Sequence, residues 1–276
     1  MQPALLKAQI EQTIPAAFTF YPREDRGSIP TGIAQIDDAV RGVPLYALTE
    51  ICGSNLTSSG KTSVLLSLLA QATRNHFCAL VDAADGFDPA SGQAAGIDFS
   101  RLLWVRCGKN HVKLPPLEQA FKVADILVQS SGFGLIVVDL SGTSERIVRK
   151  IPLTTWFRFS RVIERQAAAL VFVEQEPHAT SCAGLVLRVA SDPFVLNGKL
   201  FTGRNLNVEI VRSLGKKPVS SEKKNISKPD FSSMSNPAAE PSRYVEETGI
   251  PKHFFPGFSS CLGLSVVDVP LIPQGA

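Results

Sequence analysis

One stretch of ten residues constrains the fold of this chain more than any other. Residues 53–62 read Gly-Ser-Asn-Leu-Thr-Ser-Ser-Gly-Lys-Thr, and they follow a strand-like run at residues 48–52 and precede a helical pattern. A turn of small residues that joins a strand to a helix and ends in Gly-Lys-Thr is typical of a phosphate-binding loop. In such loops backbone N–H groups surround a phosphate, the lysine reaches the outer phosphates and the hydroxyl holds magnesium. The stretch therefore predicts a nucleotide site.

The first half of this loop departs from the usual spacing, because more than the usual four residues separate Gly53 from Gly60. Either the loop is enlarged, or Asn55 replaces the first glycine, since asparagine tolerates a positive φ. The alternative is a polar turn without a ligand, but a lysine is unfavourable at a helix start unless an anion is bound there. We expect ATP and Mg²⁺ as ligands. The predicted nucleotide-binding residues are Asn55, Thr57, Ser58, Ser59, Gly60, Lys61, Thr62 and Ser63.

Composition permits a full hydrophobic core, since the 276 residues are 44% hydrophobic and 19% charged. A net charge of +3 permits contact with nucleic acid without requiring it. The five cysteines are scattered and form no metal-ligand spacing with the isolated histidines, so we expect buried thiols and no zinc site. No apolar segment is long enough to span a bilayer and no signal sequence is evident, which predicts a cytoplasmic protein.

Three regions follow one another along the chain. We expect an N-terminal arm at residues 1–27, a nucleotide-binding α/β domain at residues 28–213 and a flexible tail at residues 214–276. Within the domain, continuous apolar runs predict parallel strands buried on both faces, and helical patterns of crossover length separate them. The expected parallel strands lie at residues 78–81, 102–105, 135–138 and 170–173, the helices at 31–40, 61–74, 117–129 and 154–166, and two antiparallel strands at 184–189 and 206–211.

The tail changes composition abruptly after Arg212. Residues 216–242 are rich in Ser, Pro, Asn and Lys, which predicts a disordered linker. Apolar residues return in the last part of the chain, beginning with Phe254, Phe255 and Phe258, but they are too few for a separate core. This segment either packs on the main domain or binds a partner protein.

Four segments, taken in order, resemble the core of the RecA recombinases. They are the phosphate loop, residues 81–89 (Val-Asp-Ala-Ala-Asp-Gly-Phe-Asp-Pro), residues 134–139 (Gly-Leu-Ile-Val-Val-Asp) and residues 171–175 (Val-Phe-Val-Glu-Gln). The resemblance implies a three-layer α/β/α domain with a largely parallel central sheet. It also implies that Thr62 and Asp139 hold Mg²⁺ and that Gln175 senses the γ-phosphate. The alternative role for Asp139 is a cap at the end of its strand.

Several strings are more similar still to ImuA, a RecA-like accessory protein of bacterial inducible mutagenesis. They are residues 31–33, 85–89, 103–107 and 151–158, within a resemblance that spans residues 29–211. This likeness implies a DNA repair protein of the SOS damage response that supports translesion synthesis or recombination. Its implied partners are ImuB-like proteins or an error-prone polymerase, and it permits homo-oligomers.

Two departures from the RecA pattern bear on activity. Ala84 stands where the recombinases have their catalytic glutamate, so we expect weak ATP hydrolysis or none, unless Asp82 or Asp85 substitutes for that base. The connection from Gln175 to Gly184 is short where the recombinases carry a long DNA-binding loop. An active ATP-dependent recombinase and a structural module without nucleotide are therefore the alternatives to an accessory factor.

Basic residues at helical spacing offer a second route to DNA. If they track phosphates, we expect binding of single-stranded DNA, and the alternative is a solvated basic face. The same spacing places Trp156, Phe159 and Ile163 on the buried side of their helix. The basic residues are Arg146, Arg149, Lys150, Arg158, Arg161 and Arg165.

Overall fold

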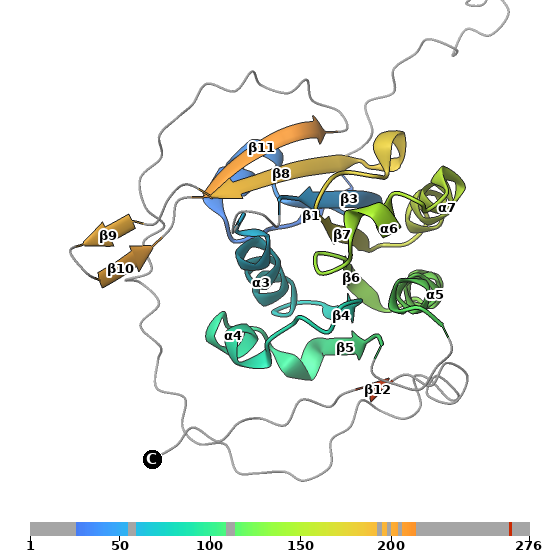
Figure 1. Ribbon diagram of the computed structural model, residues 1–276, viewed down its shortest axis with the longest axis horizontal. Coiled ribbons are helices and arrows are strands. Elements are labelled where there is room, and N and C mark those ends of the chain that lie inside the picture. The colour runs from blue at the N-terminus through green and yellow to red at the C-terminus, as the bar shows by residue number, and fades with distance from the viewer. Residues whose placement is uncertain are drawn as a thin grey trace, which may run out of the picture.

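The computed structural model describes residues 26–54, 59–108, 114–191, 195–197, 200–203, 206–213 and 265–266 (Figure 1). Its centre is a sheet with the strand order β11-β8-β3-β7-β6-β4-β5-β12. The six inner strands, from β8 to β5 in this order, run parallel to one another. The edge strands β11 and β12 pair antiparallel with β8 and β5. The strands are β3 (Ala47–Cys52), β4 (Phe77–Asp82), β5 (Leu102–Arg106), β6 (Phe133–Asp139), β7 (Ala169–Glu174), β8 (Leu185–Ser191), β11 (Leu206–Ser213) and β12 (Ser265–Val266).

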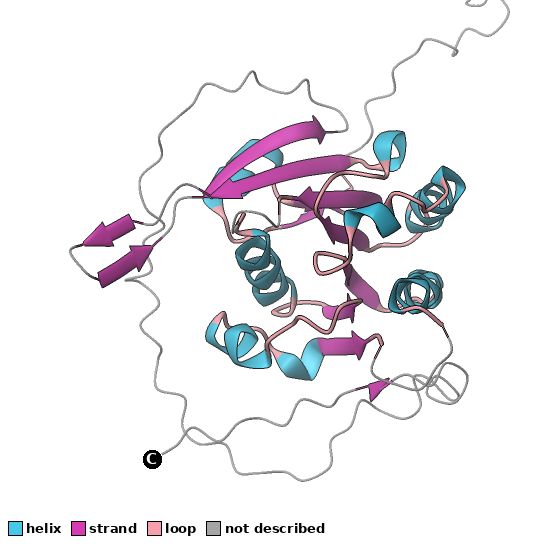
Figure 2. Cartoon of the chain, in the orientation of Figure 1, coloured by secondary structure: helices cyan, strands magenta, loops and turns pink. Residues whose placement is uncertain are grey.

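Helices cover both faces of the sheet, with α3 and α4 on one side and α5 and α7 on the other (Figures 1 and 2). The strand residues alternate between two cores, so that Leu80 and Val137 pack toward α3, whereas Val81 and Val138 pack toward α5 and α7. This double burial is the reason for the continuous apolar runs of the strands. The helices are α2 (Ala34–Val40), α3 (Lys61–Ala72), α4 (Pro89–Ala94), α5 (Pro116–Gln129), α6 (Glu145–Val148) and α7 (Leu153–Ile163), with 3-10 turns η1 (Phe99–Arg101) and η2 (Thr180–Cys182).

The predicted three-layer α/β/α architecture with a largely parallel sheet is confirmed. Each predicted strand lies within an observed one except 184–189, which begins one residue before β8. Two smaller strand pairs lie outside the central sheet. They are the antiparallel pairs of β1 (Ser28–Ile29) with β2 (Val43–Pro44) and of β9 (Val195–Asn197) with β10 (Leu200–Gly203).

One strand prediction needs correction. Residues 184–189 were expected to form an antiparallel strand, but β8 pairs parallel with β3 and antiparallel only with β11. A strand inside a parallel array is buried on both faces, as Leu187 and Val189 on one side and Val186 on the other show. Strand β11, which follows β8 in sequence, runs in the opposite direction at the edge of the sheet.

The first helix also begins later than its sequence pattern predicts. It starts at Ala34, and Ile33 at its N-cap position makes no side-chain capping bond. Instead, Asp37 in the first turn accepts hydrogen bonds from the Thr31 hydroxyl and from the backbone N–H groups of Thr31 and Gly32. The carboxylate therefore holds the preceding turn from inside the helix.

The predicted arm, apart from Arg26 and Gly27, lies outside the described residues, and so does the predicted tail, apart from β12. No helix in the described part of the chain is both long enough and apolar enough to cross a membrane.

Candidate nucleotide site

The second half of the phosphate loop joins β3 to α3. Gly60 has a φ of 89° and forms the N-cap of α3. The positive φ favours glycine here, and a Cβ atom at this position would lie 2.2 Å from Leu206 Cδ2 of β11, so the end of that side chain would have to move. Ser59 is buried, whereas Thr62 and Ser63 are exposed. The predicted loop residues Asn55, Thr57 and Ser58 lie outside the described residues.

Lys61 is buried at the first position of α3, with 5% of its surface exposed. Its Nζ donates a hydrogen bond of 3.0 Å to the backbone oxygen of Glu174 at the end of β7. Burial lowers the pKa of Lys61, and the nearby carboxyl of Asp139 opposes this shift. A buried ammonium group at the positive end of a helix is suited to an anion.

Asp139 is the last residue of β6, at the same end of the parallel strands as the start of α3. Its Oδ1 accepts a hydrogen bond of 2.9 Å from the backbone N–H of Ser141. Burial raises the pKa of Asp139, while the bonds from Ser141 and the charge of Lys61 oppose this rise. The carboxyl thus caps the end of its strand and also lies within electrostatic reach of Lys61, so the structure accommodates both roles considered for it.

Gln175 follows β7 directly, and its Nε2 donates a hydrogen bond of 2.9 Å to the backbone oxygen of Thr143. Thr143 lies in the turn after β6, which begins at Leu140. The side chain therefore bridges the ends of two adjacent parallel strands. This is a suitable place for a residue that links a bound phosphate to the loops around it.

In the turn after β4, the two carboxylates near Ala84 both form other hydrogen bonds. Asp82 accepts hydrogen bonds from the backbone N–H groups of Ala84, Gly86 and Phe87 at 3.3, 3.0 and 2.9 Å. Asp85, with a φ of 56°, points to Arg106 of β5, whose Nη2 lies 2.9 Å from Asp85 Oδ2. Both candidate substitutes for the missing base are thus engaged in holding the turn.

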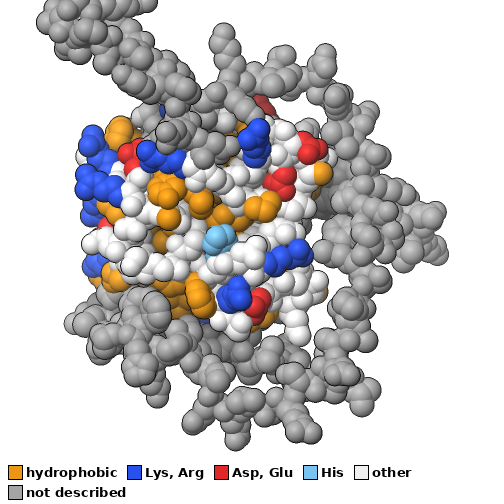
Figure 3. Space-filling view, turned by 180° about the vertical axis from the view of Figure 1, so that it is seen from behind, with side chains coloured by type: hydrophobic (Ala, Val, Ile, Leu, Met, Phe, Trp, Pro, Cys, Tyr) orange, Lys and Arg blue, Asp and Glu red, His pale blue; other side chains and the backbone are white. Residues whose placement is uncertain are grey.

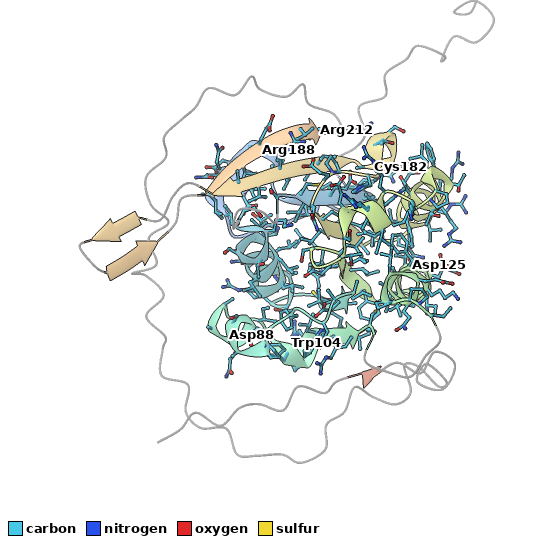
Figure 4. The ribbon with its side chains drawn as sticks, viewed as in Figure 1. Asp88, Trp104, Asp125, Cys182, Arg188 and Arg212 are labelled. Carbon is cyan, nitrogen blue, oxygen red and sulfur yellow. The ribbon has the colours of Figure 1, made fainter. Side chains whose placement is uncertain are left out.

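The predicted basic residues lie on α6, on α7 and just after these helices, and all six are exposed. The exposed Arg158 forms an ion pair of 3.3 Å with the half-buried Asp125 of α5, which Figure 4 labels. Trp156, Phe159 and Ile163 are buried, as their spacing predicts. Basic side chains also gather along the side of the molecule where α5 and α7 lie (Figure 3).

Sequence reasoning missed a buried acidic cluster formed by Glu50 of β3, Glu174 of β7 and His178. Glu50 Oε1 accepts hydrogen bonds of 2.6 Å from the backbone N–H groups of both His178 and Ala179. Glu174 Oε2 lies 2.7 Å from His178 Nδ1. No described residue donates a hydrogen bond to Glu50 Oε2 or to Glu174 Oε1. The cluster holds the loop that begins with Gln175.

Burial shifts the titration of this cluster. It raises the pKa of Glu174 to about 7, the hydrogen bond from His178 opposing it and the charge of Glu50 adding to it. Burial also raises the pKa of Glu50. The hydrogen bond to Glu174 raises the pKa of His178. The signal that could have revealed the cluster is a glutamate inside or directly after an apolar strand run, as at residues 48–52 and 171–174.

Comparison with known proteins agrees with this arrangement. Residues 21–145 match the model of the RecA N-terminal domain, and this segment contains the phosphate loop, the turn after β4 and Asp139. The fold is RecA-like. The RecA protein of Rickettsia africae is 34% identical over 122 residues, which cover 43% of this chain and 33% of that relative. The RecA protein of Fusobacterium nucleatum is 38% identical over 116 residues, covering 41% of this chain and 28% of the relative.

A third RecA protein, from Symbiobacterium thermophilum, is 39% identical over 115 residues, with 40% of this chain and 30% of the relative covered. This chain thus spans about a third of the length of these curated RecA relatives. The RecA likeness includes the phosphate loop and Asp139, whereas Gln175, Glu174 and the basic residues from Arg146 onward lie beyond the matched domain model.

Proposed function

We propose that this chain is an ATP-binding accessory protein of DNA repair that acts in the cytoplasm during damage-induced translesion synthesis or recombination. The observation that carries the proposal is the buried Lys61 at the start of α3, because an ammonium group is favourable there when it faces a phosphate. In the proposed site Lys61 and the loop amides bind the phosphates, and Thr62 and Asp139 hold Mg²⁺. Gln175 relays the presence of the γ-phosphate to the loop that the acidic cluster anchors.

The accessory role, as opposed to active recombination, is supported by the turn after β4. Ala84 cannot accept a proton, Asp82 is occupied by three backbone N–H groups and Asp85 faces Arg106. Bound ATP would then persist and stabilise one state of the protein, such as an oligomer, without being consumed. The likeness to ImuA supports an ImuB-like protein or an error-prone polymerase as the partner.

We predict that the protein turns over ATP at close to the background rate. General acid–base assistance typically contributes about 10²–10⁴-fold, and Ala84 supplies none. Steady-state phosphate release should therefore rise in Ala84→Glu, whose new carboxyl extends from a turn that packs against Gly142. Ala94→Glu, a change at the exposed last residue of α4, is the matched control and should leave the rate unchanged. Rapid turnover by the natural sequence that disappears in Lys61→Met would contradict the proposed lack of a base.

We also predict weak, sequence-tolerant binding of single-stranded DNA that depends steeply on salt. Each phosphate contact contributes about 0.7 to the slope of log K against log[salt]. Replacing Arg149, Arg161 and Arg165 by alanine should therefore reduce the slope by about 2 in a fluorescence anisotropy titration. A variant that loses three arginines elsewhere, Arg74, Arg101 and Arg188, provides a control of equal charge. Equal slopes for the two triple variants would show that Arg149, Arg161 and Arg165 do not contact DNA and form only a solvated basic face.

A further inference from the structure

The outer edge of β5, meaning the side of this strand that faces away from β4, is covered by a strand from the far end of the chain. Strand β12 (Ser265–Val266) pairs antiparallel with β5, placing Ser265 opposite Arg106 and Val266 opposite Val105. Figure 1 shows this short strand beside the edge at which the parallel array ends. Residues far apart in sequence thus form the last strand pair of the central sheet.

An uncovered edge here would be unfavourable for a physical reason. Strand β5 is apolar and buried on both faces, with Leu102 and Trp104 in one core and Leu103 and Val105 in the other. Its backbone groups on the outer edge still require hydrogen-bond partners, and an exposed apolar edge strand attracts other extended chains. Any segment that pairs there gains main-chain hydrogen bonds whatever its exact sequence.

The C-terminal part of the chain has the composition for this role. Residues 262–267 read Leu-Gly-Leu-Ser-Val-Val, whereas residues 216–242 consist mostly of Ser, Pro, Lys and Asn with apolar side chains scattered among them. Valine and other β-branched residues favour extended pairing. A strand-forming segment therefore follows a linker that has no such tendency.

The linker is also long enough to bring this segment back to its own sheet. Strands β11 and β12 are separated by seven strand-to-strand steps, or about 34 Å at about 4.8 Å per step. Residues 214–264 connect β11 to β12, and a flexible chain of this length has a typical end-to-end distance of about 40 Å. The distance across the sheet is close to the end-to-end distance of the linker, so the linker keeps β12 at a high effective concentration near β5 of the same molecule.

We propose that the segment around Ser265–Val266 is an intramolecular edge strand, which occupies a strand-accepting site on β5 and protects it from other extended segments. The site would take an extended peptide through backbone pairing once this strand is displaced. Arg106, opposite Ser265, also holds Asp85 in the turn that contains Ala84. The proposal concerns a different surface and does not depend on nucleotide binding.

Hydrogen–deuterium exchange in the full chain tests the pairing. The double substitution Ser265→Pro/Val266→Pro removes two backbone donors and disfavours the pair. Exchange in the peptide 102–107 should become faster, while exchange in β6 and β7 stays unchanged. Ser232→Pro/Ser233→Pro in the linker is the matched control and should have no effect. Equal protection of residues 102–107 in both variants and the natural protein would overturn the proposal.

A disulfide trap identifies which molecule donates the strand. In a Cys261→Ser background, Arg106→Cys/Ser265→Cys places two thiols on directly opposed residues, within reach of a disulfide after mild oxidation. A cross-linked monomer supports the proposal. A covalent dimer would show that a second copy supplies the strand, and no cross-link would contradict the register. Arg149→Cys/Ser265→Cys, with its first cysteine on the exposed end of α6, should remain uncross-linked.

Discussion

Replacing Lys61 with methionine is expected to weaken Mg-ATP binding at least about 100-fold, equivalent to about 2.7 kcal/mol. Methionine keeps most of the aliphatic side chain but lacks the ammonium group, which would form charge-assisted hydrogen bonds to the phosphates. The ammonium group already lies at the start of α3, where it donates to the backbone oxygen of Glu174. Isothermal titration calorimetry with and without Mg²⁺ measures the change.

Lys122→Met is the matched control for this experiment, because Lys122 is exposed on α5 and pairs with Glu118 at 3.2 Å. It should bind ATP as the natural protein does. Thermal unfolding of Lys61→Met separates lost binding from lost folding, since Lys61 is buried. Absence of Mg-dependent binding by the natural protein would refute the nucleotide proposal and favour a structural module. Unchanged binding by Lys61→Met would remove the lysine from the site.

Replacing Glu174 with glutamine is expected to make the free energy of unfolding less dependent on pH. Burial raises the pKa of Glu174 in the folded protein from 4.5 to about 7. A raised folded pKa contributes stability that is fully present below pH 4.5 and is lost as the pH rises through about 7. The loss amounts to about 3 kcal/mol, from 1.36 kcal/mol for each pKa unit. His178 and Glu50, whose pKa values are also raised, act in the same direction.

Urea unfolding between pH 5 and 8 measures this dependence. The natural protein should lose stability across the range, and Glu174→Gln should lose less, because its neutral amide has no charge to bury. Glu118→Gln, at an exposed position on α5, should retain the natural dependence. If Glu174→Gln and the natural protein show the same dependence, the buried carboxyl is not the group that titrates.

The fold was largely predictable because its signals are local. Strands β4, β6 and β7 are buried on both faces, and a buried parallel strand produces a continuous apolar run that is visible without knowledge of its neighbours. The direction of β8 was not predictable in this way. Its parallel pairing with β3 depends on how the loop that begins with Gln175 leads the chain back along the sheet. The hydrophobic pattern of residues 184–189 contains no information about that loop.

The candidate site was predictable where function requires particular residue types. The Gly-Lys-Thr turn and the acid that ends β6 can be recognised by their order, and the structure places Lys61 and Asp139 within electrostatic reach of each other. The acidic cluster was not predictable, because Glu50 and His178 are 128 residues apart and meet only through strand pairing and the fold of a loop. A single buried glutamate in a strand does not indicate its partner.

By itself, the sequence determined the order of strands and helices, the glycine that starts α3 and the absence of a glutamate at position 84. These features depend on local backbone preferences and on the identity of single residues. Only the tertiary structure decided that Lys61 meets the carbonyl of Glu174, that Arg106 engages Asp85 and that Ser265–Val266 lies beside β5. Each of these contacts joins segments distant along the chain, and their pairing depends on sheet order and register, which hydrophobic periodicity does not specify.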